Sequence, residues 1–321
     1  MLKFLRASLK IILPLGIGVL FIFLTFNTTT PEERELIYGY IRNVDLLFVL
    51  LSLLFGILSH VSRAYRWKFM LAHLGYRPKF INSVLAVLIA YIANLGIPRS
   101  GELLRATTLS TYEDIPFEKG FGTIIAERLV DLVILLLFIL IALGLQYDLI
   151  MGALALETIS LPKIFLLGSV LILLFIGLRF LFKKSQKPWV LKIKSKVQGL
   201  IEGILSIKNM PKKGAFIAHT LFIWIMYLAM FYVIKWTVPE TAVLGLGAIL
   251  PAFVIGGLTI SATNGGIGIY PFSVALMLSA FDISNESGLA FGWIMWTSQT
   301  AMIILFGGLA FFALPLVNQK K

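Results

Sequence analysis

Three charged residues stand inside a long apolar segment of the sequence. Glu127, Arg128 and Asp131 lie within the run from Phe117 to Gln146, which is otherwise almost entirely apolar. In a membrane span, each charge near the centre costs roughly 2.5–3.5 kcal/mol on insertion scales, so such groups usually face protein or water. A helix that enters the hydrocarbon near Gly120 places Glu127 about 10 Å deep and Asp131 about 16 Å deep. The cluster is therefore a candidate functional site.

A second group of charges precedes this segment. Arg99, Glu102 and Arg105 follow a short apolar run, and Pro98 and Gly101 lie among them. Proline breaks a helix, and glycine lets two backbones approach closely. A helix broken inside a membrane leaves polar backbone groups, which are tolerated only beside protein or a water-filled cavity. The sequence thus predicts a polar break next to the charged segment.

Helical spacing suggests how these charges pair. Glu127 and Asp131 are four residues apart and Arg128 and Asp131 are three apart, so all lie within about 100° of arc. Arg128 can pair with Asp131, which leaves Glu127 for Arg99 or Arg105 across the helix interface. Two interpretations stay open: a buried ion-pair network that fixes helix packing, and a polar cavity that holds a charged headgroup.

A glycine-rich break occurs in the second half of the chain. Gly265, Gly266 and Gly268 follow Thr263 and Asn264 directly. Three glycines within four residues indicate unwound backbone between two apolar runs. Such backbone can form an anion-binding nest, or it can serve as a tight helix contact through small residues. Both interpretations stay open.

The two breaks, near 98–101 and 264–268, are separated by about half the chain. Three full spans in the first half would place the second half in the opposite orientation. Paired interrupted helices in corresponding halves point to a transport site at the interface of inverted repeats. An inverted repeat is therefore a hypothesis for this chain.

Composition sets the class of protein. Of 321 residues, 59% are hydrophobic and 14% charged, against roughly 45–50% and 25% in soluble domains. The chain has no cysteine, which excludes disulfides, thiolate metal sites and cysteine nucleophiles. The net charge of +12 comes from basic residues in loops and tails. This pattern is typical of the positive-inside rule and of contact with anionic lipid headgroups, and no nucleic-acid signature accompanies it.

Apolar runs predict the spans, since a hydrocarbon core about 30 Å thick needs roughly 20 apolar residues per helix. The sequence predicts an all-α polytopic membrane protein in a single domain, 1–321, with about eight transmembrane helices and a re-entrant helix. The predicted spans are 8–26, 45–62, 117–145, 162–182, 214–236, 241–260, 266–281 and 287–313. The run Phe80–Ile97 is predicted to be re-entrant, because a ninth full span would put a loop of nine lysines outside the cell.

The same charges predict orientation. Basic residues precede the first span, follow the second and fill the segment 183–213. Both termini and these loops are therefore predicted to lie on the cytoplasmic side of the inner or plasma membrane. Arg63 and Arg66 are assigned to the loop after the second span. The segment 183–213 also has an apolar face and is predicted to be an amphipathic connector on the inner leaflet.

Four short motifs occur in order along the chain. They are Arg63-Ala64-Tyr65-Arg66-Trp67, Pro98-Arg99-Ser100-Gly101-Glu102 with Arg105, Glu127-Arg128-Leu129-Val130-Asp131, and Gly265-Gly266-Ile267-Gly268. With them the chain resembles the flippase-like membrane domain of the lysylphosphatidylglycerol synthase (multiple peptide resistance factor) family, over nearly its whole length. The resemblance implies translocation of a polar or aminoacylated lipid between leaflets. The soluble domain that transfers the amino acid in bifunctional members has no counterpart before the chain ends at Lys321, so aminoacyl transfer is not expected.

The leading hypothesis is a lipid flippase whose headgroup path is lined by charged and glycine residues. The candidate substrate-binding residues are Arg99, Glu102, Arg105, Glu127, Arg128, Asp131, Asn264, Gly265 and Gly266. No cofactor or metal is expected, because the three histidines are scattered and no nucleotide-binding loop is present. The expected partners are membrane lipids with polar or anionic headgroups, and a homo-oligomer or a lipid-modifying enzyme is a further candidate.

Two other functions stay open. The first is a membrane enzyme acting on a lipid-linked envelope precursor, with Glu127 or Asp131 as acid or base. The second is a scaffold for an envelope synthase, in which the charges serve packing alone.

Overall fold

The computed structural model describes residues 29–97, 99–153, 210–263 and 265–319, together with the isolated positions 19, 23, 26, 27 and 169. Every regular element in these ranges is a helix, as predicted for an all-α membrane protein. The predicted spans 8–26 and 162–182 lie almost wholly outside the described residues, as does the connector 183–213. Pro98 and Asn264 also lie outside them.

Four helices in the described part are long and apolar enough to cross a membrane. They are α3 (Leu46–His73), α6 (Phe117–Ala153), α9 (Lys213–Val233) and α12 (Asn285–Val317), and a short 3₁₀ turn, η1 (Ile234–Thr237), continues α9. At 1.5 Å per residue each rises about 30 Å or more, which matches the hydrocarbon thickness. The predicted spans 45–62, 117–145, 214–236 and 287–313 fall on these helices.

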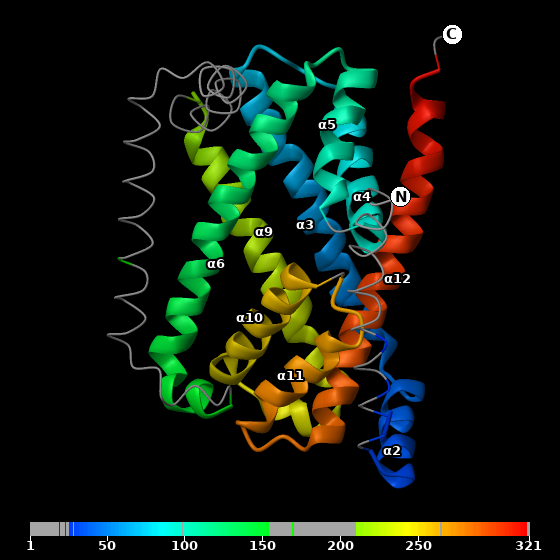
Figure 1. The fold of residues 1–321 in the computed structure, drawn as a ribbon, viewed down its shortest axis with the longest axis vertical. Coiled ribbons are helices and arrows are strands. Elements are labelled where there is room, and N and C mark those ends of the chain that lie inside the picture. The colour runs from blue at the N-terminus through cyan, green and yellow to red at the C-terminus, as the bar shows by residue number, and fades with distance from the viewer. Residues whose placement is uncertain are drawn as a thin grey trace, which may run out of the picture.

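The first break joins two short antiparallel helices. α4 (Phe80–Gly96) is the predicted re-entrant helix, and α5 (Ser100–Tyr112) returns beside it to the same end of the molecule (Figure 1). The backbone N–H of Gly101 donates to Asn94 Oδ1 at 2.7 Å, and Ser100 Oγ donates to the carbonyl of Ile97 at 2.8 Å. Side chains therefore satisfy backbone groups at the turn, as a break inside a membrane requires.

The second break also joins two short helices. α10 (Leu246–Ala262) and α11 (Ile269–Ser279) pack against each other, and they correspond to the predicted spans 241–260 and 266–281. With 11 residues, α11 rises only about 16 Å, or about half of the hydrocarbon thickness. These two segments are the arms of a second hairpin, because positive φ angles at Gly265 and Gly266 (68° and 77°) reverse the chain between them. Hydropathy alone does not distinguish two such arms from two full crossings.

The two halves of the described chain have the same order of elements in opposite directions. α3, the α4–α5 hairpin and α6 are followed by α9, the α10–α11 hairpin and α12. α3 runs upward in Figure 1 and α9 runs downward, so the first hairpin comes from the upper end and the second from the lower end. This is the arrangement of an inverted repeat.

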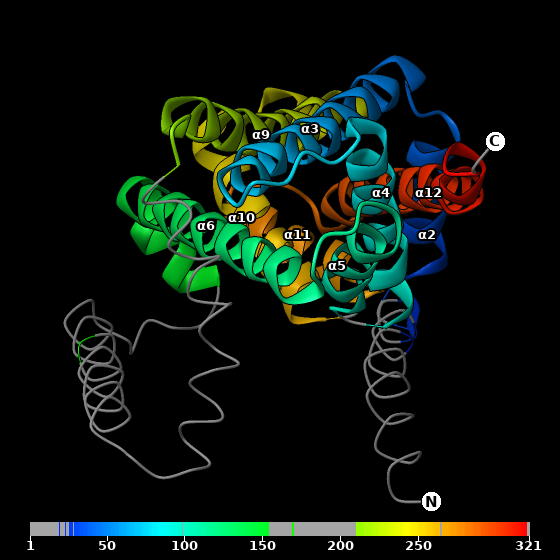
Figure 2. The same ribbon diagram turned by 90° about the horizontal axis from the view of Figure 1, so that it is seen from above.

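The tips of the two hairpins meet inside the molecule. A Cβ placed on Gly265 would lie 2.9 Å from Cδ2 of Leu95, near the end of α4. Trp296 of α12 donates its indole N–H to the carbonyl of Gly265 at 2.7 Å. Seen from above, both hairpins lie between α12 on one side and α6 and α9 on the other (Figure 2).

Two sets of buried side chains hold this arrangement. α3, α4, α5 and α6 pack around Trp67, Leu109 and Ile124, and the second half packs around Phe231 and Phe291. Large apolar side chains also cover the outside of the long helices, for example on α6 and α12. An outer surface of this kind is suited to lipid.

The η2 turn (Pro239–Val243) is bound to the start of α12 at the lower end of the molecule. Glu240 accepts hydrogen bonds from the hydroxyl and the backbone N–H of Ser284, which caps α12. The hydrogen bonds from Ser284 lower the pKa of the Glu240 carboxyl below its usual value. Their contribution to stability is therefore present at neutral pH and is lost as pH falls through the lowered pKa.

We expect Ser284→Ala to lower the free energy of unfolding by about 1 kcal/mol at neutral pH, because it removes a helix cap and a hydrogen bond to a carboxylate. The difference from the wild type should narrow in acid, as Glu240 becomes protonated. Unfolding of the protein in detergent micelles at several pH values measures it. Glu240→Gln, which does not ionise, is the control, and an effect of Ser284→Ala that is the same at every pH would contradict the assignment.

Candidate functional site

Two arginines that sequence analysis assigned to a loop lie inside the protein. α3 continues to His73, so Arg63 and Arg66 are one turn apart on a helix and are 3% and 0% exposed. The prediction that both belong to a cytoplasmic loop is therefore wrong. The prediction ended the span at its first charged residue. The helix continues, because the residues that follow are buried against other helices. The spacing of three residues between the two arginines, with Trp67 directly after them, was the sequence feature that could have indicated a continuing helix.

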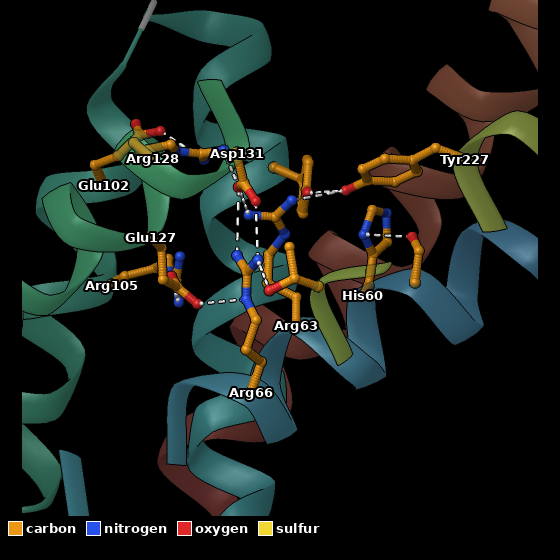
Figure 3. A network of polar contacts seen from close by, with 12 residues as sticks. His60, Arg63, Arg66, Glu102, Arg105, Glu127, Arg128, Asp131 and Tyr227 are labelled. Atoms are coloured by element: carbon orange, nitrogen blue, oxygen red, sulfur yellow. Dashed lines mark hydrogen bonds and ion pairs between the residues drawn. The ribbon is translucent and has the colours of Figure 1, made fainter. Parts of the chain in front are cut away.

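Both of these arginines form ion pairs with Asp131 on α6. Arg63 Nη1 lies 2.8 Å from Asp131 Oδ2, and Arg66 Nη1 lies 2.9 Å from Oδ1 (Figure 3). Arg128, the predicted partner, is 3.9 Å away on the same helix. The two arginines on α3 approach the carboxylate directly, which a side chain three residues along the same helix does less well. Asp131 thus joins α3 to α6.

Glu127, one turn before Asp131, is fully buried and forms a second junction. Arg105 Nη2 on α5 lies 2.9 Å from Glu127 Oε2, which confirms the predicted contact across the helix interface. Arg66 Nε lies 3.5 Å from the other oxygen of Glu127. Arg66 therefore sits between the two carboxylates, as Figure 3 shows.

A further ion pair lies at the accessible edge of the cluster. Arg128 Nη2 is 2.7 Å from Glu102 Oε1, and the Arg128 side chain is 41% exposed. This pair joins α5 to α6, as Arg105 and Glu127 do. The cluster therefore has a buried part, around Glu127 and Asp131, and an edge that solvent reaches.

Hydroxyl groups extend the network to two more helices. Arg63 Nη2 donates to Tyr227 Oη of α9 at 3.2 Å, and that oxygen lies 2.8 Å from Tyr91 Oη of α4. Arg66 Nη1 donates to Thr220 Oγ1 of α9 at 3.0 Å. These residues were not predicted, since neither tyrosine stands near a charge in the sequence. With them, the network joins α3, α4, α5, α6 and α9.

The remaining predicted site residues lie at the two hairpin tips. Arg99 precedes α5 with a φ of 62°, is exposed, and pairs with no carboxylate in the described part of the chain. The predicted contact of Arg99 with Glu127 is therefore not formed. At the other tip, Gly265 contacts Leu95, and the Gly266 N–H donates to Thr263 Oγ1 at 3.1 Å. For the glycine-rich break, the two interpretations were an anion-binding nest and a tight contact through small residues. The contact of Gly265 with Leu95 is a tight contact of the second kind.

The first hairpin also bears an apolar groove on its outer face. The groove has a volume of about 500 Å³ and lies between α4, α5 and α12. Ile92, Leu104 and Phe312 line it, with Tyr112 toward the upper end. None of the ion-paired residues lines it.

The chemistry of the cluster is that of fixed charges. Both buried carboxylates are engaged by arginines at 2.8–2.9 Å. No group of three histidine, aspartate or glutamate side chains that could hold a metal occurs among the described residues. The arrangement can bind and orient a polar or charged group at its edge.

Comparison with protein families gives a match over most of the chain. The family described as "Lysylphosphatidylglycerol synthase TM region" matches residues 11–308. Among individual proteins, the UPF0104 membrane protein MJ1595 of Methanocaldococcus jannaschii is 28% identical over 270 residues, which cover 75% of this chain and 77% of that protein.

A second similar protein matches over a shorter stretch. Glycosyltransferase AglD of Haloferax volcanii is 27% identical over 128 residues, which are 40% of this chain and 20% of that protein. The likeness therefore concerns only a fifth of the glycosyltransferase. No solved structure matches the chain.

Proposed function

Because the chain belongs to the lysylphosphatidylglycerol synthase transmembrane-region family, we propose that this multi-pass membrane protein moves a lipid with a polar headgroup between the two leaflets. The observation that carries the proposal is the meeting of two oppositely directed hairpins beside a cluster of membrane-embedded charges. Broken helices at the interface of inverted repeats are typical of transport sites, because each side of such an interface can open in turn.

The edge of the cluster is where a headgroup would bind. Arg128 and Glu102 are accessible there, and Arg99 stands one turn before Glu102 at the hairpin tip. A headgroup that contacts these side chains exchanges water for fixed charges and does not enter hydrocarbon. The acyl chains stay in the lipid, beside the apolar outer faces of α5 and α6.

The buried part of the cluster would position this edge. Glu127 and Asp131 hold α3, α5 and α6 together through arginines that have almost no exposure. Buried ion pairs contribute little net stability, but they specify one arrangement, since a displaced partner leaves a charge unpaired. We assign a positioning role to Glu127 and Asp131, and a headgroup-binding role to Arg99, Glu102 and Arg128.

Orientation is part of the proposal. The loop between α3 and α4 and the start of α9 are at the upper end of Figure 1, and they contain Arg77, Lys79 and Lys212. The η2 turn and the loop before α12 are at the lower end, and they contain Glu240 and Asp282. By the positive-inside rule, the upper end lies on the cytoplasmic side of the cell membrane. The first hairpin then inserts from the cytoplasmic side and the second from the outer side.

Translocation is tested with purified protein in vesicles that carry a fluorescent lipid. The protein should let a membrane-impermeant quencher reach nearly all of the labelled lipid, against about half in empty vesicles, because lipid from the inner leaflet appears outside. Arg128→Gln should slow this exchange, and Arg77→Gln, at an exposed loop arginine, should not. Protein-containing vesicles that behave as empty ones do, across lipids with anionic, zwitterionic and cationic headgroups, would contradict the proposal.

An enzymatic role is the alternative, and the geometry does not favour it. A general acid or base must reach the proton it transfers, whereas the carboxylates of Glu127 and Asp131 are already engaged by arginines. Lipid analysis of a strain lacking the protein separates the two functions. A missing lipid species indicates an enzyme, and an unchanged set of lipids with an altered leaflet distribution indicates a translocase.

A further inference from the structure

The described residues leave the apolar groove on the first hairpin open. It has a volume of about 500 Å³ between α4, α5 and α12. A second hollow of about 460 Å³ continues it toward the hairpin tip, since Ile92, Ala93 and Leu104 line both. Leu104 is 40% exposed, and Phe312 on the α12 wall is 71% exposed. The two hollows therefore form one apolar groove on the outer surface of the molecule.

A groove of this kind is a site for an apolar partner inside the membrane. Helices in a bilayer associate through van der Waals packing and through the release of lipid ordered against them. Atoms that line an unfilled gap lose packing contacts, so a partner that enters the groove gains more of them than one on a smooth surface. The described residues that line the groove include no charged side chain. A helix or an acyl chain is therefore the kind of occupant that fits.

The chain itself supplies an apolar segment. The predicted span 8–26 comes before the described helices, and its last residue, Phe26, is held by α2 (Pro31–Arg42). The Arg34 guanidinium lies 4.0 Å from the centroid of the Phe26 ring, and Thr29 donates its hydroxyl to the carbonyl of Phe26 at 3.3 Å. α2 packs against α12 at the lower end of the molecule (Figure 1). The span therefore ends beside the helix that forms one wall of the groove.

The length and charge of this segment bring it past the groove. At 1.5 Å per residue, a helical span 8–26 is about 28 Å long, which is close to the hydrocarbon thickness. Lys3, Arg6 and Lys10 assign its beginning to the cytoplasmic side, which is the upper end of Figure 1. Phe312 and Pro315 line the groove near the upper end of α12. A span that rises from α2 along α12 therefore has its first half at the level of the groove.

One side of the predicted span is suited to the groove. Four large apolar residues recur at intervals of four and three, and so share one side of a helix: Leu13, Ile17, Leu20 and Leu24. Val19 and Phe23 belong to another side, and they are 63% and 58% exposed. The exposed residues are suited to lipid, which leaves the leucine and isoleucine side for a protein contact.

We infer that the groove between α4, α5 and α12 is the docking site of the chain's own first span, which enters it through the side of Leu13 and Ile17. α2 holds the end of the span beside α12, so the contact forms within one chain at a high effective concentration. A separate lipid or a second copy of the chain has no such tether. The docked span packs on both arms of the first hairpin, and it thereby limits how far that hairpin can move away from α12.

Disulfide cross-linking of the full chain in membranes tests this contact, because the chain has no cysteine of its own. Leu104→Cys is combined with Leu13→Cys or with Ile17→Cys, and the membranes are then oxidised. A protease site inserted after Asn43, between α2 and α3, lets electrophoresis without reductant show whether the two fragments stay joined.

The matched controls place the first cysteine on the other side of the span. Ile12→Cys replaces Leu13→Cys, and Val19→Cys replaces Ile17→Cys, each again with Leu104→Cys. A disulfide forms only where the two Cα atoms come within about 7 Å, so we expect about tenfold more joined product from positions 13 and 17 than from the controls. Because all these positions are in apolar, outward segments, the variants are expected to fold, and thermal unfolding of each checks this.

The remaining outcomes overturn the inference. If no position of the span joins to Leu104→Cys, the span does not occupy the groove, and a tightly bound lipid in native mass spectra then identifies an acyl chain in its place. Equal product from both sides of the span contradicts the assigned contact. A cross-link between two chains, seen as a dimer before protease is added, identifies a second copy as the occupant. None of these results depends on whether the protein moves lipid.

Discussion

Asp131→Asn is expected to lower the free energy of unfolding by about 3–5 kcal/mol, because it leaves two buried arginines without their shared carboxylate. Arg63 and Arg66 lie 2.8 Å and 2.9 Å from Asp131 and are almost completely buried. An amide presents one acceptor oxygen and no charge, so it does not replace the carboxylate. Unfolding of the detergent-solubilised protein by sodium dodecyl sulfate, followed by tryptophan fluorescence, measures the loss.

Glu102→Gln is the matched control for Asp131→Asn. It also replaces a carboxylate that pairs with an arginine, but Arg128 is 41% exposed and water can solvate it. The expected cost is about 0–1 kcal/mol. The double substitution of Arg63→Gln with Asp131→Asn should cost less than the sum of the two single ones, since they act on one contact. Equal losses for Asp131→Asn and Glu102→Gln would show that burial does not set the strength of these pairs.

Gly101→Ala is expected to destabilise the protein by about 3 kcal/mol, at the upper end of the range for overpacking. A Cβ at Gly101 would lie 2.7 Å from the carbonyl carbon and 2.9 Å from the Cα of Ala90 on the facing helix. These are backbone atoms, so no side-chain rotation relieves the contact. The two arms of the first hairpin must separate, which also moves Arg105 away from Glu127. Thermal unfolding and lipid exchange in vesicles should both show the change.

Gly308→Ala is the control for replacing a helical glycine by alanine. Gly308 is in the interior of α12, and nothing lies within 4 Å of a Cβ placed there. The substitution should be neutral or stabilising by up to about 1 kcal/mol, because alanine favours a helix more than glycine does. If Gly101→Ala were equally harmless, the close approach of α4 and α5 would not be a constraint on the fold.

The first hairpin is held from two sides, against α4 by close packing and against α6 by ion pairs. Gly101 sets how closely α5 approaches α4, and Arg105 and Glu102 bind α5 to α6. A hairpin held by charges can move only if those charges find other partners, which water or a headgroup at the edge can supply. Movement of the hairpin and binding of a headgroup would therefore both involve the accessible pair of Glu102 and Arg128.

Several features followed from the sequence by itself. Hydropathy located the four long helices, because a helix that crosses a bilayer must be apolar over about 20 residues. Loop charges and parity predicted that the run Phe80–Ile97 does not cross, and α4 turns back at its end. The charges at Glu127 and Asp131 stood out because apolar surroundings make them costly. The sequence also predicted that Glu127 pairs with Arg99 or Arg105, and the structure has Arg105 in that place.

Only the tertiary structure decided which residues complete the site. Arg63 and Asp131 are 68 residues apart, and no local spacing relates them. Tyr227 is farther still from Arg63, yet donor and acceptor meet at 3.2 Å. Periodicity tells which residues share one face of a helix, but the faces that meet depend on how all helices pack together.

The same reason explains the hairpin at 246–279. By hydropathy, the two arms of this hairpin cannot be told from two full membrane spans, since both would be apolar. The hairpin differs from two spans in the length of its helices and in the contact of Gly265 with Leu95. The sequence therefore determined which segments enter the membrane and which of their residues are costly there. The packing of the two halves against each other decided how deep each segment reaches and which charges compensate one another, because those are properties of contacts between distant parts of the chain.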